Sequence, residues 1–317
     1  MSLEKKQFLL DEVYSITALK DQSIAYGSNN QIKILDSADG LLIRTLGGHK
    51  GPVLSLVPLS DGRLASGNQL EIIIWDVTTG RIISNLSENR KSFVLADYDQ
   101  NKIIYATSLH RLIVWDTKEK KIFEEIDSPF GHKDTVTALT KLEANEIASG
   151  SNDTTIKIWA VDCTDGRHLY KKTLSKHKST IVSLVKLPGK KLASAASQDL
   201  YIIIWNLETY EPFIFLGYGQ KISSLTLLSD GVSLASISND LTIRLWDTWG
   251  MRIVKILKGH TDSTFQTCKG LKAESFCKNF PNISLALMED GRLISGSADK
   301  SIIVWHNAKT KSKLVFL

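Results

Sequence analysis

The chain repeats one short pattern at a nearly constant interval. Six of its seven tryptophans each end a run of alternating apolar residues, such as TIKIW or SIIVW. They are Trp75, Trp115, Trp159, Trp205, Trp246 and Trp305. Leu35 holds the same place once earlier, and the steps from Leu35 onward are 40, 40, 44, 46, 41 and 59 residues. Such a period indicates one structural unit that is copied along the chain, so the sequence predicts seven copies.

The fourth copy shows the secondary structure of the unit most clearly. Residues 131–162 begin with Gly-His, continue with the alternating run VTAL, and turn into a second run, EIASGS. Asn152-Asp153 predicts a tight turn into TIKIW, and LYKKTL provides a fourth strand. A sheet of four short antiparallel strands cannot bury both of its faces alone. Seven such sheets stacked radially bury one another, so we predict an all-β fold, a seven-bladed β-propeller of four-stranded antiparallel blades.

Recurring dipeptides carry a resemblance to a known family. Gly-His opens three copies, at Gly48-His49, Gly131-His132 and Gly259-His260. Trp-Asp closes three, at Trp75-Asp76, Trp115-Asp116 and Trp246-Asp247. In these elements the chain resembles the WD-repeat family over nearly its whole length. The resemblance implies one propeller over residues 1–317, with repeats at approximately 13–49, 50–90, 91–132, 133–177, 178–219, 220–260 and 261–317.

The resemblance also implies a role for recurring polar residues. In WD repeats a histidine, a serine or threonine, the turn aspartate and the tryptophan form a buried hydrogen-bonded chain. This suits their chemistry, because an indole N–H only donates, a carboxylate only accepts, and imidazole and hydroxyl groups relay between them. By position, the sets are His132, Ser149, Asp153 and Trp159; His177, Ser194, Asp199 and Trp205; and His260, Ser295, Asp299 and Trp305.

Two other copies depart from this set. The sixth keeps Ser236, Asp240 and Trp246 but has a Gly-Tyr-Gly segment where Gly-His is expected. The second has His49 and Ser66 but a shortened turn, with no aspartate six residues before its tryptophan. The first and third copies match least well. We expect blades one to three to have weaker local stability, within the same fold.

Serine, histidine and aspartate together also suggest a hydrolase, but the repetition argues against one. A hydrolase needs a single set that opens into a pocket beside oxyanion donors, whereas this set recurs three times at positions that pack against the next blade. We therefore predict a structural role for the sets and no catalytic residues. An enzyme would require a pocket at the central channel with one perturbed acid or base.

Metal and cofactor sites are not indicated. Cys268 and Cys277 are nine residues apart with no second cysteine pair, and most histidines belong to the repeat. Phosphate-loop, dinucleotide and His-Glu-x-x-His motifs are absent from the sequence, so we predict no cofactor and no metal. There is no apolar stretch of membrane-spanning length and no secretory signal pattern. We expect a cytoplasmic protein, with a nuclear location left open.

One loop is much longer than its equivalents. From His49 to Leu64 there are 15 residues, but from His260 to the matching Leu293 there are 33. The additional residues place an insertion at 263–280, between blades six and seven, and it carries Phe265 and Phe276. Buried aromatic residues dominate interface energetics, so one interpretation is an anchor for a partner protein. The alternative is a surface insertion whose phenylalanines pack on their own blade.

Lysines recur in the loops at the Gly-His end of the blades. They are Lys50, Lys91, Lys133, Lys178 and Lys221. On a propeller they would ring one end, the top face, and would favour an acidic peptide, a phosphopeptide or an anionic lipid headgroup. The alternative is ordinary filling of a solvated loop, and lysines such as Lys118 and Lys121 at the opposite end weaken the case for selection. No aromatic residues interleave with these lysines, which disfavours nucleic acid.

Together these features predict a binding module. Its function would be that of a non-catalytic scaffold or adaptor, which presents a rigid top face to one or more proteins through the 263–280 insertion and the lysine-rich rim. The alternative is recognition of acidic, phosphorylated or anionic-lipid ligands by the same lysines.

The sequence leaves the strand that closes the ring open. KQFLL near the N-terminus could supply the outer strand of the last blade, as could KLVFL at the C-terminus. Phe316 lies 11 residues after Trp305, as Leu86 does after Trp75. Polar Ser312 and Lys313, where other blades have Ile or Val, favour the N-terminal strand.

Overall fold

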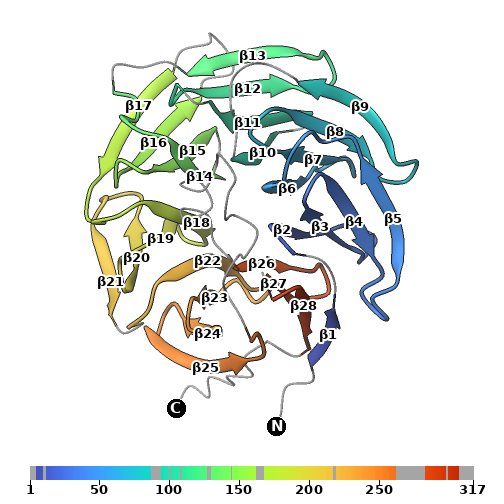
Figure 1. Cartoon of the computed structure of the whole chain (residues 1–317). Coiled ribbons are helices and arrows are strands. Elements are labelled where there is room, and N and C mark those ends of the chain that lie inside the picture. The colour runs from blue at the N-terminus through green and yellow to red at the C-terminus, as the bar shows by residue number, and fades with distance from the viewer. Residues whose placement is uncertain are drawn as a thin grey trace, which may run out of the picture.

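The computed structural model describes most of the chain. The described residues are 5–9, 12–86, 94–99, 101–107, 109–126, 130–143, 145–161, 168–216, 219–261, 283–297 and 299–306. They form seven four-stranded antiparallel sheets around a common centre (Figure 1). The prediction of a seven-bladed β-propeller is therefore confirmed.

The first three blades follow one another along the chain. Blade one contains β2 (Ser15–Ala18), β3 (Ile24–Ser28), β4 (Gln31–Leu35) and β5 (Leu42–Gly47). Blade two contains β6 (Ser55–Pro58), β7 (Leu64–Gly67), β8 (Ile72–Asp76) and β9 (Arg81–Leu86). Blade three contains β10 (Leu95–Asp99), β11 (Lys102–Ala106), β12 (Leu112–Asp116) and β13 (Lys121–Ile126).

The three inner strands of blades four to six are six or seven residues long. Blade four contains β14 (Val136–Lys141), β15 (Glu146–Ser151), β16 (Ile156–Val161) and β17 (His168–Leu174). Blade five contains β18 (Ile181–Leu187), β19 (Lys191–Ala196), β20 (Tyr201–Asn206) and β21 (Pro212–Leu216). Blade six contains β22 (Ile222–Leu227), β23 (Ser233–Ser238), β24 (Thr242–Asp247) and β25 (Arg252–Lys258).

Blade seven joins the two ends of the described chain. It contains β26 (Ile283–Leu287), β27 (Leu293–Ser297) and β28 (Ser301–Trp305), and its outer strand is β1 (Lys5–Leu9). β1 pairs antiparallel with β28, with Lys5 opposite Trp305 and Leu9 opposite Ser301. The N-terminal segment thus supplies the outer strand of the last blade, and Figure 1 shows β1 beside β28. The C-terminal KLVFL segment lies outside the described residues.

In five of the seven blades the tryptophan position, which is Leu35 in blade one, coincides with a local change in register between the third and fourth strands. Blades five and seven show no such shift between their described strands. In blade four the pairing of β16 with β17 shifts between Ile158 and Trp159, and in blade one the same shift falls between Ile34 and Leu35. A β-bulge at this point increases the twist of the outer strand. Leu35 therefore has the backbone role of the tryptophan, although its side chain cannot hydrogen-bond.

The hydrophobic core lies between the blades. One cluster joins Ile156 and Ile158 of blade four to Ile181 and Leu184 of blade five. The contact is close: a Cβ on Gly150 would lie 2.4 Å from a side-chain atom of Ile181. Because each sheet packs in this way on the next, the faces that a single blade could not bury are covered, as the repeat predicts.

The ring closes through a cluster that contains the N-terminal strand. Phe8 of β1 belongs to the same buried cluster as Ile16 and Ile24 of blade one and Ile302 of blade seven. Its neighbour Gln7 is exposed. The closure therefore depends on side-chain packing between the first and last blades as well as on the β1–β28 ladder.

We expect Phe8→Ala to lower the free energy of unfolding by roughly 3 kcal/mol, because it leaves a cavity at the closure. Gln7→Ala, one residue away in the same strand, should change it by less than about 0.5 kcal/mol. Urea unfolding followed by tryptophan fluorescence measures both. Equal effects of the two substitutions would show that the closure does not depend on this packing.

Candidate interaction surface

A buried chain of hydrogen bonds crosses blade four from the tryptophan to the turn. The Trp159 indole N–H donates to Ser149 Oγ at 2.9 Å, and Ser149 Oγ lies 2.8 Å from His132 Nε2. His132 Nδ1 lies 2.9 Å from Asp153 Oδ2. Since the indole N–H can only donate and the carboxylate only accept, the pattern assigns the serine proton to Nε2 and the imidazole proton to Nδ1.

Blades five and seven contain the same chain. In blade five, Trp205 donates to Ser194 at 2.8 Å, and His177 lies 2.7 Å from both Ser194 and Asp199. In blade seven, the corresponding distances through Trp305, Ser295, His260 and Asp299 are 2.9, 2.8 and 2.9 Å. The structure thus brings together all four members of each of the three sets.

The turn carboxylate also holds the main chain of the neighbouring top-face loop. Asp153 Oδ2 accepts the backbone N–H of Lys133 at 2.9 Å. Asp199 Oδ2 accepts that of Lys178 at 3.1 Å, and Asp299 Oδ2 that of Thr261 at 3.0 Å. The residue after each histidine is therefore fixed by a group inside the blade.

These carboxylates stay ionised far into the acid range. Burial raises the pKa of Asp299, but hydrogen bonds from His260, Ser301 and the Thr261 backbone outweigh it and lower the pKa to about 2. Burial likewise opposes the hydrogen bonds that His132, Thr155 and the Lys133 backbone donate to Asp153, yet the pKa of Asp153 lies well below its usual range. At neutral pH each turn therefore holds a negative charge that its donors solvate.

Blade two reaches the same result with two different residues. Asn68 Oδ1 accepts the backbone N–H groups of Leu70 and Glu71, so its Nδ2 faces His49 Nδ1 at 3.1 Å. Nδ1 must then accept, and the proton lies on Nε2, 2.6 Å from Ser66 Oγ. Glu71 Oε1 takes over the backbone contact and accepts the Lys50 N–H at 2.7 Å. The sequence pattern missed both substitutes because neither lies at the aspartate position.

The imidazole of blade two is neutral as a consequence. Burial lowers the pKa of His49 to about 4, and the charge of Glu71, whose Oε1 lies 3.7 Å from Nδ1, raises it only in part. A proton added to Nδ1 would face the Asn68 amide N–H, which cannot accept it.

Blades six and three depart further. In blade six, Trp246 donates to Ser236 at 2.7 Å, and Asp240 forms an ion pair with Arg244 at 3.0 Å. In blade three, Tyr105 stands where the serine would be, and the buried N–H of Trp115 has no hydrogen-bond partner among the described residues. Arg244 could have been suspected from the sequence as a cation four residues after the turn aspartate.

The serine–histidine–aspartate sets are closed to a substrate. The side chains of His132, His177 and His260 are at most 1% exposed. Ser149, Ser194 and Ser295 are fully buried. Each serine hydroxyl accepts a hydrogen bond from an indole N–H, which is not the environment of a catalytic nucleophile. The sets therefore support the structure of the blade.

The rim lysines that the structure describes are exposed residues. They are Lys50, Lys133, Lys178 and Lys221, and none has an ion-pair partner within 4.0 Å in the described part of the chain. Lys91, Phe265, Phe276 and the whole 263–280 insertion lie outside the described residues.

Apolar side chains accompany these lysines on the top face. Leu70, Leu109 and Leu200 lie in the turns between the second and third strands of their blades and are 50%, 63% and 45% exposed. Leu70 precedes Glu71 and Leu200 follows Asp199, so each is adjacent to a carboxylate that holds a rim lysine. The signal in the sequence is a leucine inside a polar turn, which the period of the repeat does not single out.

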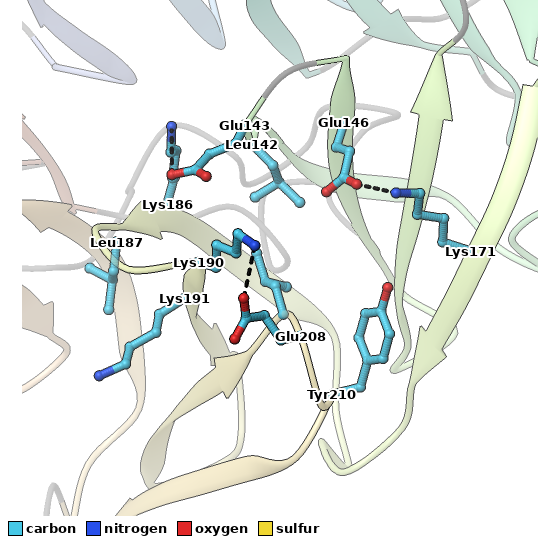
Figure 2. Close-up of a pocket in the computed structure, with 11 residues that line it drawn as sticks. Leu142, Glu143, Glu146, Lys171, Lys186, Leu187, Lys190, Lys191, Glu208 and Tyr210 are labelled. Atoms are coloured by element: carbon cyan, nitrogen blue, oxygen red, sulfur yellow. Dashed lines mark hydrogen bonds and ion pairs between the residues drawn. The ribbon is translucent and has the colours of Figure 1, made fainter.

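A pocket lies at the opposite end of the blades, the bottom face, where the third strand of each blade ends near its tryptophan position. It is formed by turns of blades four and five (Figure 2).

Among the residues that the structure describes, no helix is long and apolar enough to cross a membrane. The same residues contain no cluster of three or more histidine, cysteine or acidic side chains suited to a metal ion.

Comparisons with known proteins agree with the repeated four-stranded blades of the structure. The family model of the WD domain, G-beta repeat, matches residues 40–76, 123–160, 211–247 and 275–306. Autophagy-related protein 16 of Arabidopsis thaliana is 23% identical over 82% of this chain and 48% of its own length. WD repeat domain-containing protein 83 homolog of Dictyostelium discoideum is 22% identical over 86% of this chain and 87% of its own length.

A further relative is guanine nucleotide-binding protein subunit beta of Zea mays, which is 27% identical over 66% of this chain and 60% of its own length. The chain spans about half the length of the Arabidopsis relative.

We expect Ser149→Ala to lower the free energy of unfolding by about 1–3 kcal/mol, because it leaves the buried groups of His132 and Trp159 unpaired. Ser175→Ala, at an exposed position of the same blade, should change it by less than about 0.5 kcal/mol. Denaturant titration of both variants makes the comparison. A loss at Ser149 no larger than that at Ser175 would contradict the assigned hydrogen bonds.

We expect His49 to make stability depend on pH. Between its unperturbed pKa of 6.5 and about 4, the unfolded chain binds a proton that the folded chain does not. The free energy of unfolding should therefore fall as the pH is lowered through this window. His49→Gln should remove roughly 3 kcal/mol of that fall, at about 1.4 kcal/mol per pKa unit.

Urea titrations of the wild type and His49→Gln between pH 4 and 7 measure this difference. The reading is the slope against pH, which does not depend on the overall stability of the variant. Identical slopes would contradict a neutral, buried imidazole.

Proposed function

The chain belongs to the WD-repeat family, and on this premise we propose that it is a non-catalytic scaffold or adaptor that binds other proteins through its top face. The contact would combine the lysine rim with the leucines of the adjacent turns. The supporting observation is that side chains of the blade turns hold the backbone of Lys50, Lys133 and Lys178, while these residues remain exposed.

Preorganisation is the physical basis of the proposal. Binding ordinarily costs free energy to order loops and side chains, about 0.5–1.5 kcal/mol for each immobilised flexible side chain. At Lys50, Lys133 and Lys178 the backbone is already fixed, so only the side chain must be ordered when a partner binds. A few contacts on such a surface then provide useful affinity.

The chemistry of the rim favours acidic segments that also carry an apolar residue. Lys178 has no carboxylate partner within the described residues, and the exposed Leu200 is adjacent to the aspartate that holds it. Lys50 and Leu70 are arranged around Glu71 in the same way. Opposite charges would speed association and set orientation, and the leucines would add apolar area.

The 263–280 insertion remains part of the proposal on sequence grounds. Its Phe265 and Phe276 would extend the contact at the loop before blade seven. A role within an assembly is in keeping with the name of the maize relative, which describes a subunit.

Recognition of a phosphorylated or anionic-lipid ligand is the second candidate, because the same unpaired ammonium groups would serve it. Flotation of the protein with vesicles that contain phosphatidylserine, lost between about 50 and 200 mM salt, would favour this candidate. Binding only to protein partners would favour the first.

We expect Lys133→Glu with Lys178→Glu to weaken capture of a partner by on the order of tenfold without lowering the midpoint of thermal unfolding, since both side chains are exposed and unpaired. Lys118→Glu with Lys121→Glu makes the same charge change on the bottom face and should leave capture unchanged. Affinity capture from a native lysate, with quantitative mass spectrometry, compares the three proteins.

Equal capture by all three would remove the rim from the contact surface. Deletion of residues 263–280 in the same assay tests the insertion. A partner that is lost only with the deletion would place its contact there.

A further inference from the structure

The bottom-face pocket has a volume of about 350 Å³ and lies between blades four and five. The turns that form it follow β14, β18 and β20, and the outer strand β17 contributes Lys171. Its size falls within the range of about 300–1,000 Å³ that is usual for ligand sites. It lies at the opposite end of the blades from the rim lysines.

The pocket combines an apolar lining with three ion pairs. Leu142, Leu187 and Leu207 are its apolar lining residues, of which Leu142 and Leu187 are each 2% exposed. Around them, Lys171 pairs with Glu146, Lys186 with Glu143 at 3.8 Å, and Lys190 with Glu208 at 2.8 Å. Figure 2 shows the three pairs around Leu142, with the hydroxyl of Tyr210 directed toward the Glu146 side.

The ion pairs can exchange partners at little cost. The side chains of Lys190 and Glu208 are 58% and 61% exposed, and those of Lys186 and Glu143 are 41% and 49% exposed. Exposed pairs of this kind contribute about 0–1 kcal/mol. An acidic ligand could therefore take a lysine from its glutamate without a large penalty.

Two further lysines, Lys191 in the lining and Lys172 beside it, have no carboxylate partner within 4.0 Å among the described residues. The ammonium of Lys191 lies 4.9 Å from the ring centroid of Trp249, and that of Lys172 lies 5.7 Å from the ring of Tyr210. A ring face attracts a cation but leaves its charge in place. With four lysines and three glutamates in its lining, and Lys172 alongside, the site is net positive.

Two lining residues take backbone conformations that disfavour side chains. Lys190 has φ 53° and Tyr210 has φ 61°. At the position of Lys190 blades two and seven have Gly62 and Gly291, and at that of Tyr210 blades one and two have Gly40 and Gly80, all with positive φ. A left-handed conformation costs a residue with a side chain about 1–2 kcal/mol.

Lys120 and Met251 take the same turn position as Tyr210 in blades three and six. Blade five differs because both of its strained side chains line a single pocket. Gln22 and Asn101 take the position of Lys190 in blades one and three, also with positive φ, so the conformation belongs to this turn and the shared pocket is what is particular to blade five.

We propose that this pocket binds a short segment of a partner protein in which an apolar side chain is flanked by acidic residues. The apolar side chain would lie on the leucines, and the carboxylates would contact Lys190 and the lysines around it. The site is independent of the top face, so one propeller could hold two segments at once, with the gain in avidity that linked contacts bring.

The test is panning of a phage-displayed random heptapeptide library on the intact protein. We expect enrichment of sequences with a leucine, isoleucine or phenylalanine between acidic residues. A synthetic peptide of the enriched sequence should bind Lys190→Gly about fivefold more weakly than wild type, the effect of one exposed charge contact. Because glycine relieves the left-handed strain, the same variant should have a higher midpoint of thermal unfolding.

Lys120→Gly is the matched control. It removes a lysine with φ 54° from a bottom-face turn of blade three, so it should raise the unfolding midpoint but leave peptide binding unchanged. Lys133→Glu with Lys178→Glu should also leave it unchanged, which separates this site from the top face. Enrichment of basic or uncharged peptides, no enrichment, or equal binding by Lys190→Gly and wild type would each overturn the proposal.

Discussion

In blades four, five and seven, the carboxylate in the turn between the second and third strands connects the interior of the blade to its surface. On one side it accepts a hydrogen bond from the imidazole, which is linked through the serine to the tryptophan. On the other it accepts the backbone N–H of the rim loop. Such bonds are strong in a medium of low dielectric, and each member polarises the next. One side chain therefore determines both the packing of the blade and the position of the residue that a partner meets.

The blades that lack this aspartate chain show what the fold requires. In blade two, Asn68 hydrogen-bonds the imidazole of His49 and Glu71 accepts the backbone N–H of Lys50. Two residues therefore make the contacts that one aspartate makes in blades four, five and seven. In blade six, Arg244 pairs with the aspartate. In both blades the polar groups near the turn have a hydrogen-bond or ion-pair partner. Without one, the free-energy cost of burying such a group would exceed the net stabilisation from the remaining hydrogen bonds.

Much of this could be predicted from the sequence, because a repeat fixes positions. The period gave the number of blades, and constant spacing placed Ser149 and Asp153 relative to Trp159. Glu71 and Asn68 were missed because they act from offsets that no other blade uses. The pocket was missed because its walls come from turns of two blades, which strand periodicity does not encode. The roles of Lys91, Phe265 and Phe276 stay predictions.

The most direct test of the central claim is amide hydrogen exchange at single residues in the wild type and Asp153→Ala. If the buried carboxylate holds the rim, the Lys133 amide should lose its protection in the variant. The Lys178 amide, which Asp199 holds in the next blade, should exchange as before. Unchanged protection at Lys133 would contradict the account, since the rim would then be ordered by something other than the turn carboxylate.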